Sequence, residues 1–332
     1  SVSVCEGEND DEVADAPESG DAAPAPAAPE PEESPYEPSP APADGRFCML
    51  SRIEENRYGY GHRKYDTAVT LESFCEDFRN YAASRLGLYY DIDDIRRFVA
   101  GMAVSKILIL QGMSGTGKTS LAHAFGEFVD NRSTVIPVQP MWKERTDLIG
   151  YYNEFTKRFN ETLLLEKMYE ANYSGDMYVT VLDEMNIARV EYYFAEFLSL
   201  LELPNPEERY LTVVSDTWPS DPAGLKDGRI KLPVNMWFIG TANNDDSTFA
   251  VSDKVYDRAL TINIDNKGIP FDAPDGEALT IAQKKLKSAR LDARLHFRIY
   301  KKSLDARRKS AILKVCSVLC ESDEPLRVSA ER

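Results

Sequence analysis

Between residues 106 and 120 an apolar run breaks into a glycine-rich loop. Gly112, Gly117, Lys118 and Thr119 have the spacing G-x-x-x-x-G-K-[ST], in which glycines let backbone N–H groups surround a phosphate. The lysine would contact the β- and γ-phosphates of a nucleotide, and the threonine hydroxyl would bind Mg²⁺. The candidate nucleotide-binding residues of the loop are Gly112, Ser114, Gly115, Thr116, Gly117, Lys118, Thr119 and Ser120.

The residues on both sides of this loop have the pattern that phosphate binding requires. Residues 107–110 can form a buried strand, and residues 121–128 can form a helix. The N-terminus of that helix would add a partial positive charge near the phosphate. We therefore favour a phosphate-binding loop over a glycine turn that arose by chance.

Two adjacent carboxylates follow the apolar run at residues 178–182. Nucleotide hydrolysis needs one carboxylate near Mg²⁺ and a second that orients or deprotonates the attacking water. We assign the first role, with Thr119 as the other metal ligand, to Asp183 and the second role to Glu184. Strands often end in solvated acids, but a position 65 residues after Lys118 makes the pair a strong signal.

Two further polar residues are candidates for a hydrolytic site. Asn243 ends the next apolar run, where its amide could hydrogen-bond the γ-phosphate or the attacking water. A simple turn is the alternative for this asparagine. Arg258 is a candidate to reach the γ-phosphate of a neighbouring subunit, which gives it a catalytic role. A surface ion pair with Asp253 or Asp257 is the alternative for this arginine.

Strand and helix patterns alternate along the chain, which argues for an α/β fold with a parallel sheet covered by helices. Asp91 is a candidate N-cap for a helix that ends near Ala103. A β-hairpin is expected from residues 210–214 and 229–232. The expected strands are 107–110, 134–138, 178–182, 234–239 and 260–264; the other expected helices begin near residue 70 or span 121–128, 161–173 and 188–203.

Four motifs in chain order resemble those of the AAA+ ATPases: the glycine-rich loop, Asp183-Glu-Met-Asn186, Gly240-Thr-Ala-Asn243 and the segment that ends at Arg258. The pattern is most similar to the branch that contains McrB, a 5-methylcytosine-specific restriction GTPase subunit, and the MoxR-like ATPases. The resemblance spans roughly residues 90–265. It implies a P-loop NTPase with a five-stranded parallel αβα core. It also implies a homo-oligomeric ring, usually a hexamer, in which the adjacent subunit completes each site.

The same resemblance assigns roles to individual residues. Asn243 would be the sensor-1 residue, and Arg258 would be the finger that acts on the neighbouring site. Residues 139–150 resemble the segment that leads to inserted elements facing the ring pore. The chain departs from the family at Ile187, where many members have an arginine, and Arg189 lies two residues further on. No sensor-2 arginine or four-helix lid is recognisable near the C-terminus, which implies a truncated or degenerate lid.

Composition divides the chain of 332 residues into four expected parts. Residues 1–46 hold 13 Asp or Glu and one Arg, so this Pro/Ala/Glu-rich tail carries −12 of the net charge of −16 and is expected to be disordered. A helical segment (47–102), the nucleotide-binding core (103–265) and a short, helical, basic C-terminal segment (266–332) follow. No apolar run approaches the ~18 residues of a membrane span, so a soluble cytoplasmic protein with no membrane contact is expected. Five cysteines without C-x-x-C spacing suggest neither a zinc site nor a disulfide framework.

The basic segment contains twelve Lys or Arg and two Asp between residues 284 and 314. A stripe of that charge could attract nucleic acid through its phosphates. A solvated helix, or pairing with the acidic tail, remains an alternative.

Together the motifs predict an AAA+ NTPase that uses ATP, or GTP, with Mg²⁺ to remodel or translocate a macromolecule. The McrB resemblance implies the motor subunit of a restriction or defence system, with a nuclease or effector subunit as partner. A MoxR-like protein-remodelling chaperone and a nucleotide-gated scaffold with little hydrolysis are the alternatives. The sequence offers no base-reading residue that decides between ATP and GTP.

Overall fold

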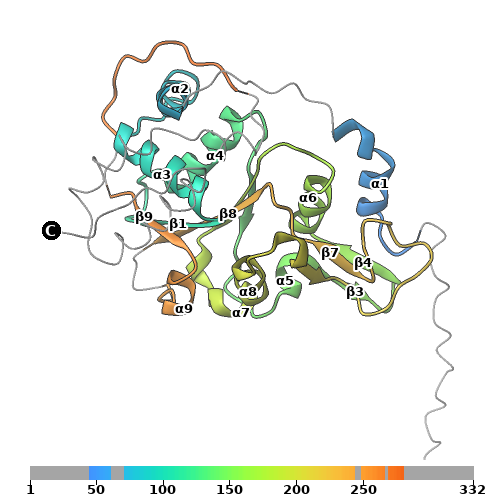
Figure 1. The fold of residues 1–332 in the computed structure, drawn as a ribbon. Helices are drawn as coiled ribbons and strands as arrows, with labels where there is room; N and C mark the ends of the chain where they lie inside the picture. Colours follow the sequence, from blue (N-terminus) through green and yellow to red (C-terminus); the bar gives the residue numbers. More distant parts are fainter. Residues whose placement is uncertain (1–44, 61–70, 244–247, 266–267, 280–332) are drawn as a thin grey trace, which may run out of the picture. The chain divides into compact units, whose positions relative to one another are not determined.

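The computed structural model describes residues 45–60, 71–243, 248–265 and 268–279 (Figure 1). The expected acidic tail up to residue 44 and the basic segment from residue 280 lie outside the described residues, as does the predicted charge of residues 284–314.

A five-stranded parallel sheet lies at the centre of the fold and confirms the predicted α/β class. Its strand order is β2-β5-β8-β1-β9. The register pairs Gly112 with Asn243 and Leu182 with Gly240, so β1, β5 and β8 end at the same edge. The strands are β1 (Ile107–Gly112), β2 (Thr134–Pro137), β5 (Tyr178–Asp183), β8 (Met236–Asn243) and β9 (Leu260–Asn263).

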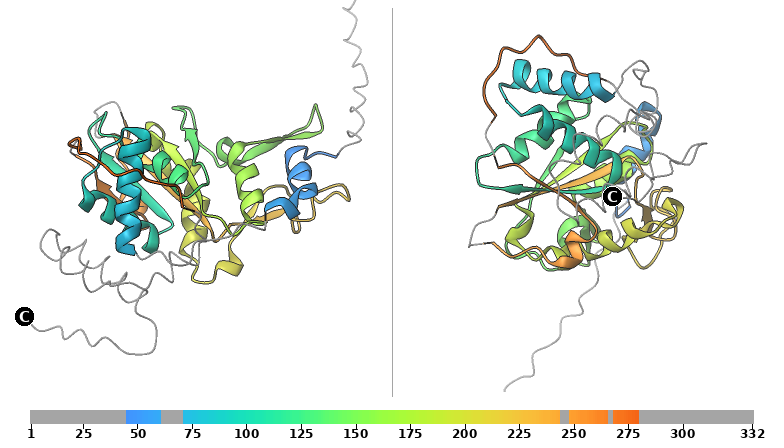
Figure 2. Two further views of the ribbon diagram at one scale, coloured as in Figure 1. Left: turned by 90° about the horizontal axis from the view of Figure 1, so that it is seen from above. Right: turned by 60° about the vertical axis from the view of Figure 1, so that its left-hand side comes forward.

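Alternating strand residues point to opposite faces of the sheet, and each face has its own buried cluster. Leu108 and Trp237 belong to the cluster under α2 (Leu71–Leu86), α3 (Ile92–Val104) and α4 (Lys118–Phe128). Figure 2 shows these three helices on one side of the sheet. The predicted N-cap is confirmed, since the Asp91 side chain accepts a hydrogen bond from Asp93 N.

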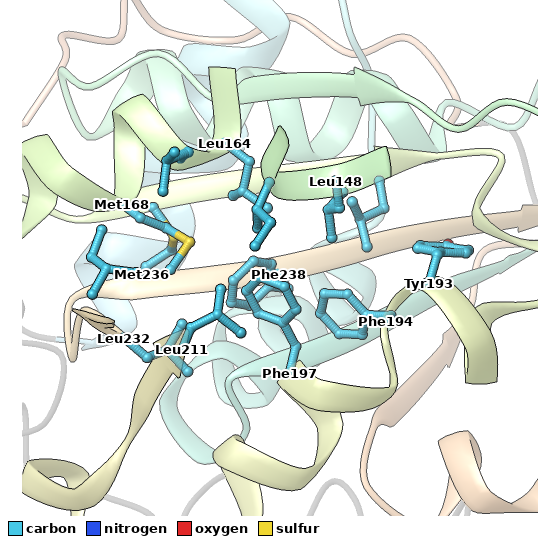
Figure 3. Close-up of a cluster of buried hydrophobic side chains, with 14 of the residues drawn as sticks. Leu148, Leu164, Met168, Tyr193, Phe194, Phe197, Leu211, Leu232, Met236 and Phe238 are labelled. Carbon is cyan, nitrogen blue, oxygen red and sulfur yellow. The ribbon is translucent and has the colours of Figure 1, made fainter. Parts of the chain in front are cut away.

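The other face is covered by α6 (Leu163–Ala171), α7 (Val190–Tyr193) and α8 (Ala195–Glu202). Phe238 of the sheet lies edge-on to Phe194 and Phe197, whose rings stack with centroids 4.9 Å apart (Figure 3). Because both faces are buried, the central strands β1, β5 and β8 are largely apolar, as the sequence indicated.

Two predicted helices differ from the observed ones. The helix expected at 161–173 starts later, at Leu163, because Thr162 caps it and Glu161 is the last residue of a strand. The helix expected at 188–203 is divided at Phe194, whose φ of −109° and ψ of 4° are not helical. This break lets Tyr193, Phe194 and Phe197 all enter the same core, so apolar periodicity continues across it.

Two hairpins lie outside the central sheet. The predicted one is confirmed as β6 (Tyr210–Thr212) antiparallel to β7 (Arg229–Lys231). The second, β3 (Gly150–Asn153) with β4 (Arg158–Glu161), was not predicted. Gly150 is required at its start, since a Cβ there would lie 1.9 Å from the Asn160 carbonyl oxygen.

Short helices complete the described fold. The Glu161 carboxylate accepts hydrogen bonds from the backbone N–H groups of Cys48, Met49 and Leu50, and so caps α1, which packs on α6. The remaining helices are α1 (Met49–Glu55), α5 (Thr146–Ile149) and α9 (Asp253–Tyr256), with 3-10 turns at Arg57–Tyr60, Met185–Ile187 and Pro206–Glu208.

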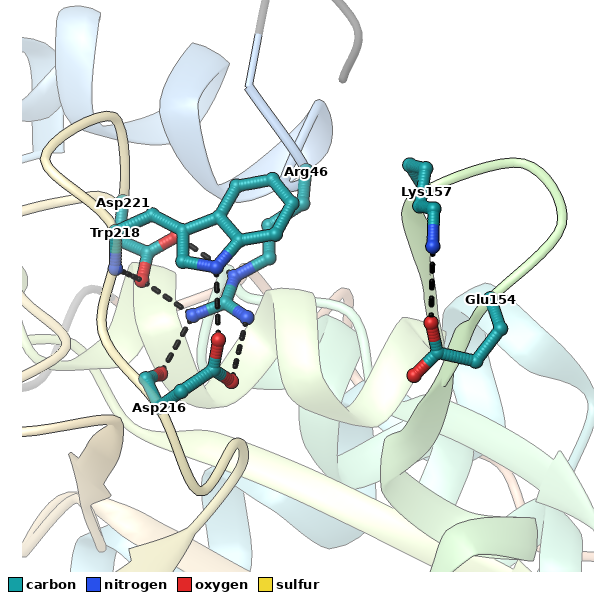
Figure 4. Close-up of polar contacts among 6 residues, drawn as sticks. All are labelled: Arg46, Glu154, Lys157, Asp216, Trp218 and Asp221. Atoms are coloured by element: carbon teal, nitrogen blue, oxygen red, sulfur yellow. Dashed lines mark hydrogen bonds and ion pairs between the residues drawn. The ribbon is translucent and has the colours of Figure 1, made fainter. Parts of the chain in front are cut away.

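Arg46 fixes the long loop of the β6–β7 hairpin to the first described residues of the chain. Its guanidinium donates to the carboxylates of Asp216 and Asp221 and lies 4.6 Å from the Trp218 ring centroid (Figure 4). Burial disfavours the charged guanidinium, but the two aspartates outweigh burial and raise the pKa of Arg46. The bonds from Arg46 and Trp218 lower the pKa of Asp216. Figure 4 also shows the Glu154–Lys157 ion pair in the β3–β4 turn.

Candidate functional site

The glycine-rich loop connects β1 to α4 at the carboxyl edge of the sheet. Gly112, Gly115 and Gly117 have φ values of 149°, 76° and 85°, which favour glycine. At Gly112 a Cβ would also lie 2.4 Å from the Ile264 carbonyl oxygen. The loop tip, which includes Ser114, is exposed, so it is open to a ligand.

Lys118 begins α4 with its side chain folded into the loop. Its Nζ donates to the carbonyls of Gly112, at 3.1 Å, and Met113, at 2.6 Å. Thr116 Oγ1 donates to the same Met113 carbonyl at 3.0 Å. The lysine is 6% exposed, so the loop surrounds its charge. Ser120 follows in the first turn of α4 and is half-buried.

Asp183 joins the loop to two strands through hydrogen bonds. Its Oδ1 accepts from Thr119 Oγ1 at 2.6 Å and from Thr241 Oγ1 at 2.8 Å. Thr241 Oγ1 in turn accepts from Glu184 N at 2.9 Å. The sequence analysis did not single out Thr241. Its position could have identified it: Thr241 lies two residues before Asn243 on a strand, and alternate residues of a strand point to the same face.

Glu184 and Asn243 meet at the same edge. Asn243 Nδ2 donates to Glu184 Oε1 at 3.4 Å. Glu184 has φ 51° and ψ 48°, the left-handed region that non-glycine residues seldom adopt. Such a conformation persists where the surroundings fix it, and it often occurs at functional sites.

Asn186 holds the backbone of Asn243 in place, and the sequence analysis did not identify it as a separate site residue. It is 5% exposed, and its Nδ2 donates to the Asn243 carbonyl at 3.0 Å and to Thr248 Oγ1 at 2.9 Å. Gly240 packs closely on Met185, the residue before Asn186, since a Cβ on Gly240 would lie 1.9 Å from Met185 Sδ. The motifs D-E-M-N and G-T-A-N therefore pack against each other.

Arg258, the candidate for a trans-acting role, and Arg189 contact other residues. Arg258 Nη2 donates to Glu202 Oε2 at 2.8 Å and Nη1 donates to the Lys254 carbonyl at 2.7 Å. Its ion-pair partner is thus Glu202, not the Asp253 or Asp257 considered from sequence. The Arg189 guanidinium lies over the rings of Tyr192 and Phe249. The trans-acting role of Arg258 stays a prediction.

The residues at this edge fit a nucleotide with Mg²⁺. Thr119 and Asp183 supply the oxygen ligands that Mg²⁺ prefers. Among the described residues there is no group of three or more His, Cys, Asp or Glu side chains that could hold a metal. A magnesium ion here would therefore also need phosphate oxygens, which is the usual way nucleotide sites hold it.

A family model and a solved structure each match part of this chain. Residues 107–259 match the family model of the AAA domain, dynein-related subfamily. No curated protein matches the chain. A crystal structure from Cytophaga hutchinsonii ATCC 33406, described as a “putative ATPase”, is 13% identical with a TM-score of 0.43; the match covers 74% of this chain and 65% of that one. In the described part of the chain, no helix has the length and apolarity to cross a membrane.

Proposed function

We propose that the chain binds ATP with Mg²⁺ and hydrolyses it, because residues 107–259 match the family model of the AAA domain, dynein-related subfamily. The observation that carries the proposal is the hydrogen-bonded series from Thr119 through Asp183, Thr241 and Glu184 to Asn243. It joins the phosphate-binding loop to Glu184 and Asn243, two of the three candidate catalytic residues.

Each residue of this series has a proposed role in the reaction. The N–H groups of the loop and Lys118 Nζ bind the phosphates, after the lysine exchanges its bonds to Gly112 and Met113 for phosphate oxygens. Thr119 and Asp183 hold Mg²⁺, which when bound neutralises charge on the phosphates. These groups position the γ-phosphate without forming a covalent bond to it.

Glu184 is the proposed water-activating group. Asn243 donates to its Oε1, which orients the carboxylate. A water would donate a proton to Oε2 and attack the γ-phosphorus, while the bond to the leaving ADP oxygen breaks. The products are ADP and inorganic phosphate, and the carboxylate returns its proton to solvent.

We further propose that the chain acts as a homo-oligomeric ring on a macromolecule. In such a ring Arg258 would exchange Glu202 for the γ-phosphate of a neighbouring subunit. The β3–β4 hairpin follows the segment 139–150 and presents Phe155, which is 73% exposed, near its turn. An exposed aromatic on a hairpin supports contact with a client.

If the chain acts like McrB, it would have a nuclease or effector subunit as partner and a nucleic acid as client. If it acts like the MoxR-like ATPases, its client would be a protein. Hydrolysis stimulated by DNA would favour the first, and hydrolysis stimulated by unfolded protein and indifferent to DNA would favour the second. Nucleotide binding without turnover would favour a nucleotide-gated scaffold instead.

The test is Mg²⁺-dependent phosphate release from ATP and from GTP over a range of protein concentrations. Glu184→Gln should keep ATP binding and abolish turnover, whereas Lys118→Ala should abolish binding. Glu207→Gln, an exposed residue on a short helical turn, is the matched control and should behave as wild type. Undiminished turnover in Glu184→Gln would contradict the catalytic role of Glu184. A rate of phosphate release per subunit that rises with protein concentration would support a site shared between subunits.

A further inference from the structure

Tyr90 contacts the phosphate-binding loop from outside the motif. It lies on the connection between α2 and α3 and is 6% exposed. Its hydroxyl donates to the Gly117 carbonyl at 3.1 Å. That carbonyl also accepts from Leu121 N at 2.8 Å, the first hydrogen bond of α4. One oxygen atom is therefore held from two directions.

These two bonds also fix the next donor of the loop. The described chain contains no cis peptide, so in the planar Gly117–Lys118 peptide the C=O and N–H point in opposite directions. A carbonyl held toward Tyr90 and Leu121 sets the Lys118 N–H to point the other way. Backbone N–H groups in the first turn of a helix are the donors that bind phosphate.

The Tyr90 ring also limits the space beside the loop. A Cβ on Gly117 would lie 3.2 Å from the Tyr90 hydroxyl oxygen and 3.4 Å from Cε1. With a φ of 85°, Gly117 adopts a conformation that a larger residue would strain. The ring and the glycine therefore pack as a matched pair.

Tyr90 is held in place by Arg79 of α2 and by the chain that follows β9. Arg79 Nε donates to the Tyr90 carbonyl at 3.1 Å, and the Arg79 guanidinium lies 3.8 Å from the Phe271 ring centroid. Gly268 packs on the Tyr89 carbonyl, where a Cβ would lie 1.7 Å from the oxygen. Burial raises the pKa of the Tyr90 phenol, so the hydroxyl keeps its proton at neutral pH.

We propose that Tyr90 is a positioning residue for nucleotide binding, whose hydroxyl orients the Gly117–Lys118 peptide so that Lys118 N–H meets the nucleotide phosphates. The inference rests on the proposed function, since it needs a nucleotide in the loop. It adds a determinant of affinity that the glycine-rich motif does not contain.

The test compares Tyr90→Phe with wild type in the full chain. Equilibrium binding of ATP and of ADP with Mg²⁺ should weaken by about 3- to 10-fold, the effect of one lost hydrogen bond. The KM for ATP should rise by a similar factor, and kcat should change less. The thermal unfolding midpoint should stay close to that of wild type, because the ring is kept.

Two further variants separate positioning from packing. Tyr178→Phe is the matched control, since Tyr178 is 5% exposed and its hydroxyl donates to Glu170 at the opposite edge of the sheet. It should leave ATP affinity unchanged. Tyr90→Leu removes ring and hydroxyl together; phenylalanine should restore the stability that leucine loses, but not the ATP affinity.

The outcomes distinguish this inference from the proposed function. If wild type binds ATP and Tyr90→Phe binds it equally well, the inference is overturned and the proposed function stands. If Tyr178→Phe weakens ATP binding as much as Tyr90→Phe does, the effect is general and the inference is again overturned. If wild type binds neither ATP nor GTP, the proposed function fails and the inference fails with it.

Discussion

The side-chain amide of Asn186 donates to the backbone carbonyl of Asn243, 3.0 Å away, and so joins the turn after β5 to the end of β8. Glu184 lies two residues before Asn186, and the Asn243 side chain contacts Glu184. One buried amide thus holds both halves of the candidate catalytic pair. Four predictions follow from this and related contacts.

Asn186→Ala should destabilise the protein by about 2 kcal/mol, because Asn243 O, Thr248 Oγ1 and Phe249 O each lose the donor that Asn186 supplies. Turnover should fall further than stability alone explains, since Glu184 and Asn243 lose their relative position. Asn235→Ala is the matched control: it removes a buried amide that donates to the Ala171 and Asp176 carbonyls, near the amino end of β5. Chemical denaturation and phosphate release check both. Equal losses of turnover in the two variants would contradict a local role for Asn186.

Thr241→Val should reduce the affinity for Mg²⁺, because Asp183 loses one of the two hydroxyls that orient its carboxylate. The Mg²⁺ concentration for half-maximal turnover should rise several-fold, with a stability loss of about 1 kcal/mol. Thr180→Val is the control, since Thr180 is buried in β5 and its Oγ1 has no hydrogen-bond partner within the described residues. That variant should be neutral or slightly stabilising. If turnover in Thr241→Val depends on Mg²⁺ as it does in wild type, Thr241 does not orient Asp183 for Mg²⁺ binding.

The bond between Arg46 and Asp216 should make stability depend on pH. The pKa of Asp216 is lowered in the folded protein, so its charged form stabilises the fold above its ordinary pKa of 3.8. As the pH falls through the lowered pKa, this contribution disappears. Asp216→Asn should therefore be less stable than wild type at neutral pH, and the difference should shrink below pH 3.8. Chemical denaturation at a series of pH values measures the difference in unfolding free energy between wild type and Asp216→Asn, with the exposed Asp227→Asn as the control. A difference that does not change with pH would contradict the role of the Asp216 charge.

Gly240→Ala should destabilise the protein by about 1–3 kcal/mol, the usual range for overpacking a core. The new methyl group would overlap Met185, which is buried. Met185→Ala leaves a cavity that the new methyl group partly fills, so the double variant should lose less stability than the sum of the two single variants. Thermal or chemical unfolding of the single and double variants gives the coupling between the two positions. Purely additive effects would show that the two residues do not compete for the same space.

The closeness of most candidate site residues could be predicted because they belong to local motifs. Gly112 to Thr119 and Asp183 follow strands whose apolar runs are visible in the sequence, and the observed sheet brings Asp183 to Thr119. Glu184 and Asn243 also lie together. Their catalytic roles stay predictions, as contacts do not measure turnover.

The missed residues depend on long-range contacts. Thr241 and Asn186 lie inside motifs that were recognised, but their hydrogen-bond partners are 58 and 57 residues away. Arg46 lies at the end of the expected acidic tail, and its partner Asp216 is 170 residues away. The spacing of apolar residues in a short stretch of sequence does not reveal contacts between residues so far apart in the chain. The division of the helix at Phe194 was missed for a related reason, since periodicity measures which face is apolar and not whether the backbone is continuous.

The cap that Glu161 provides has a consequence for local opening of the structure. Helix α1 has seven residues, which is too short to persist alone in water. Three of its first amides are held by a carboxylate on β4, so α1 and the β3–β4 hairpin should open as one cooperative unit. Hydrogen exchange at Cys48, Met49 and Leu50 would then report the opening of a hairpin about 110 residues further along the chain.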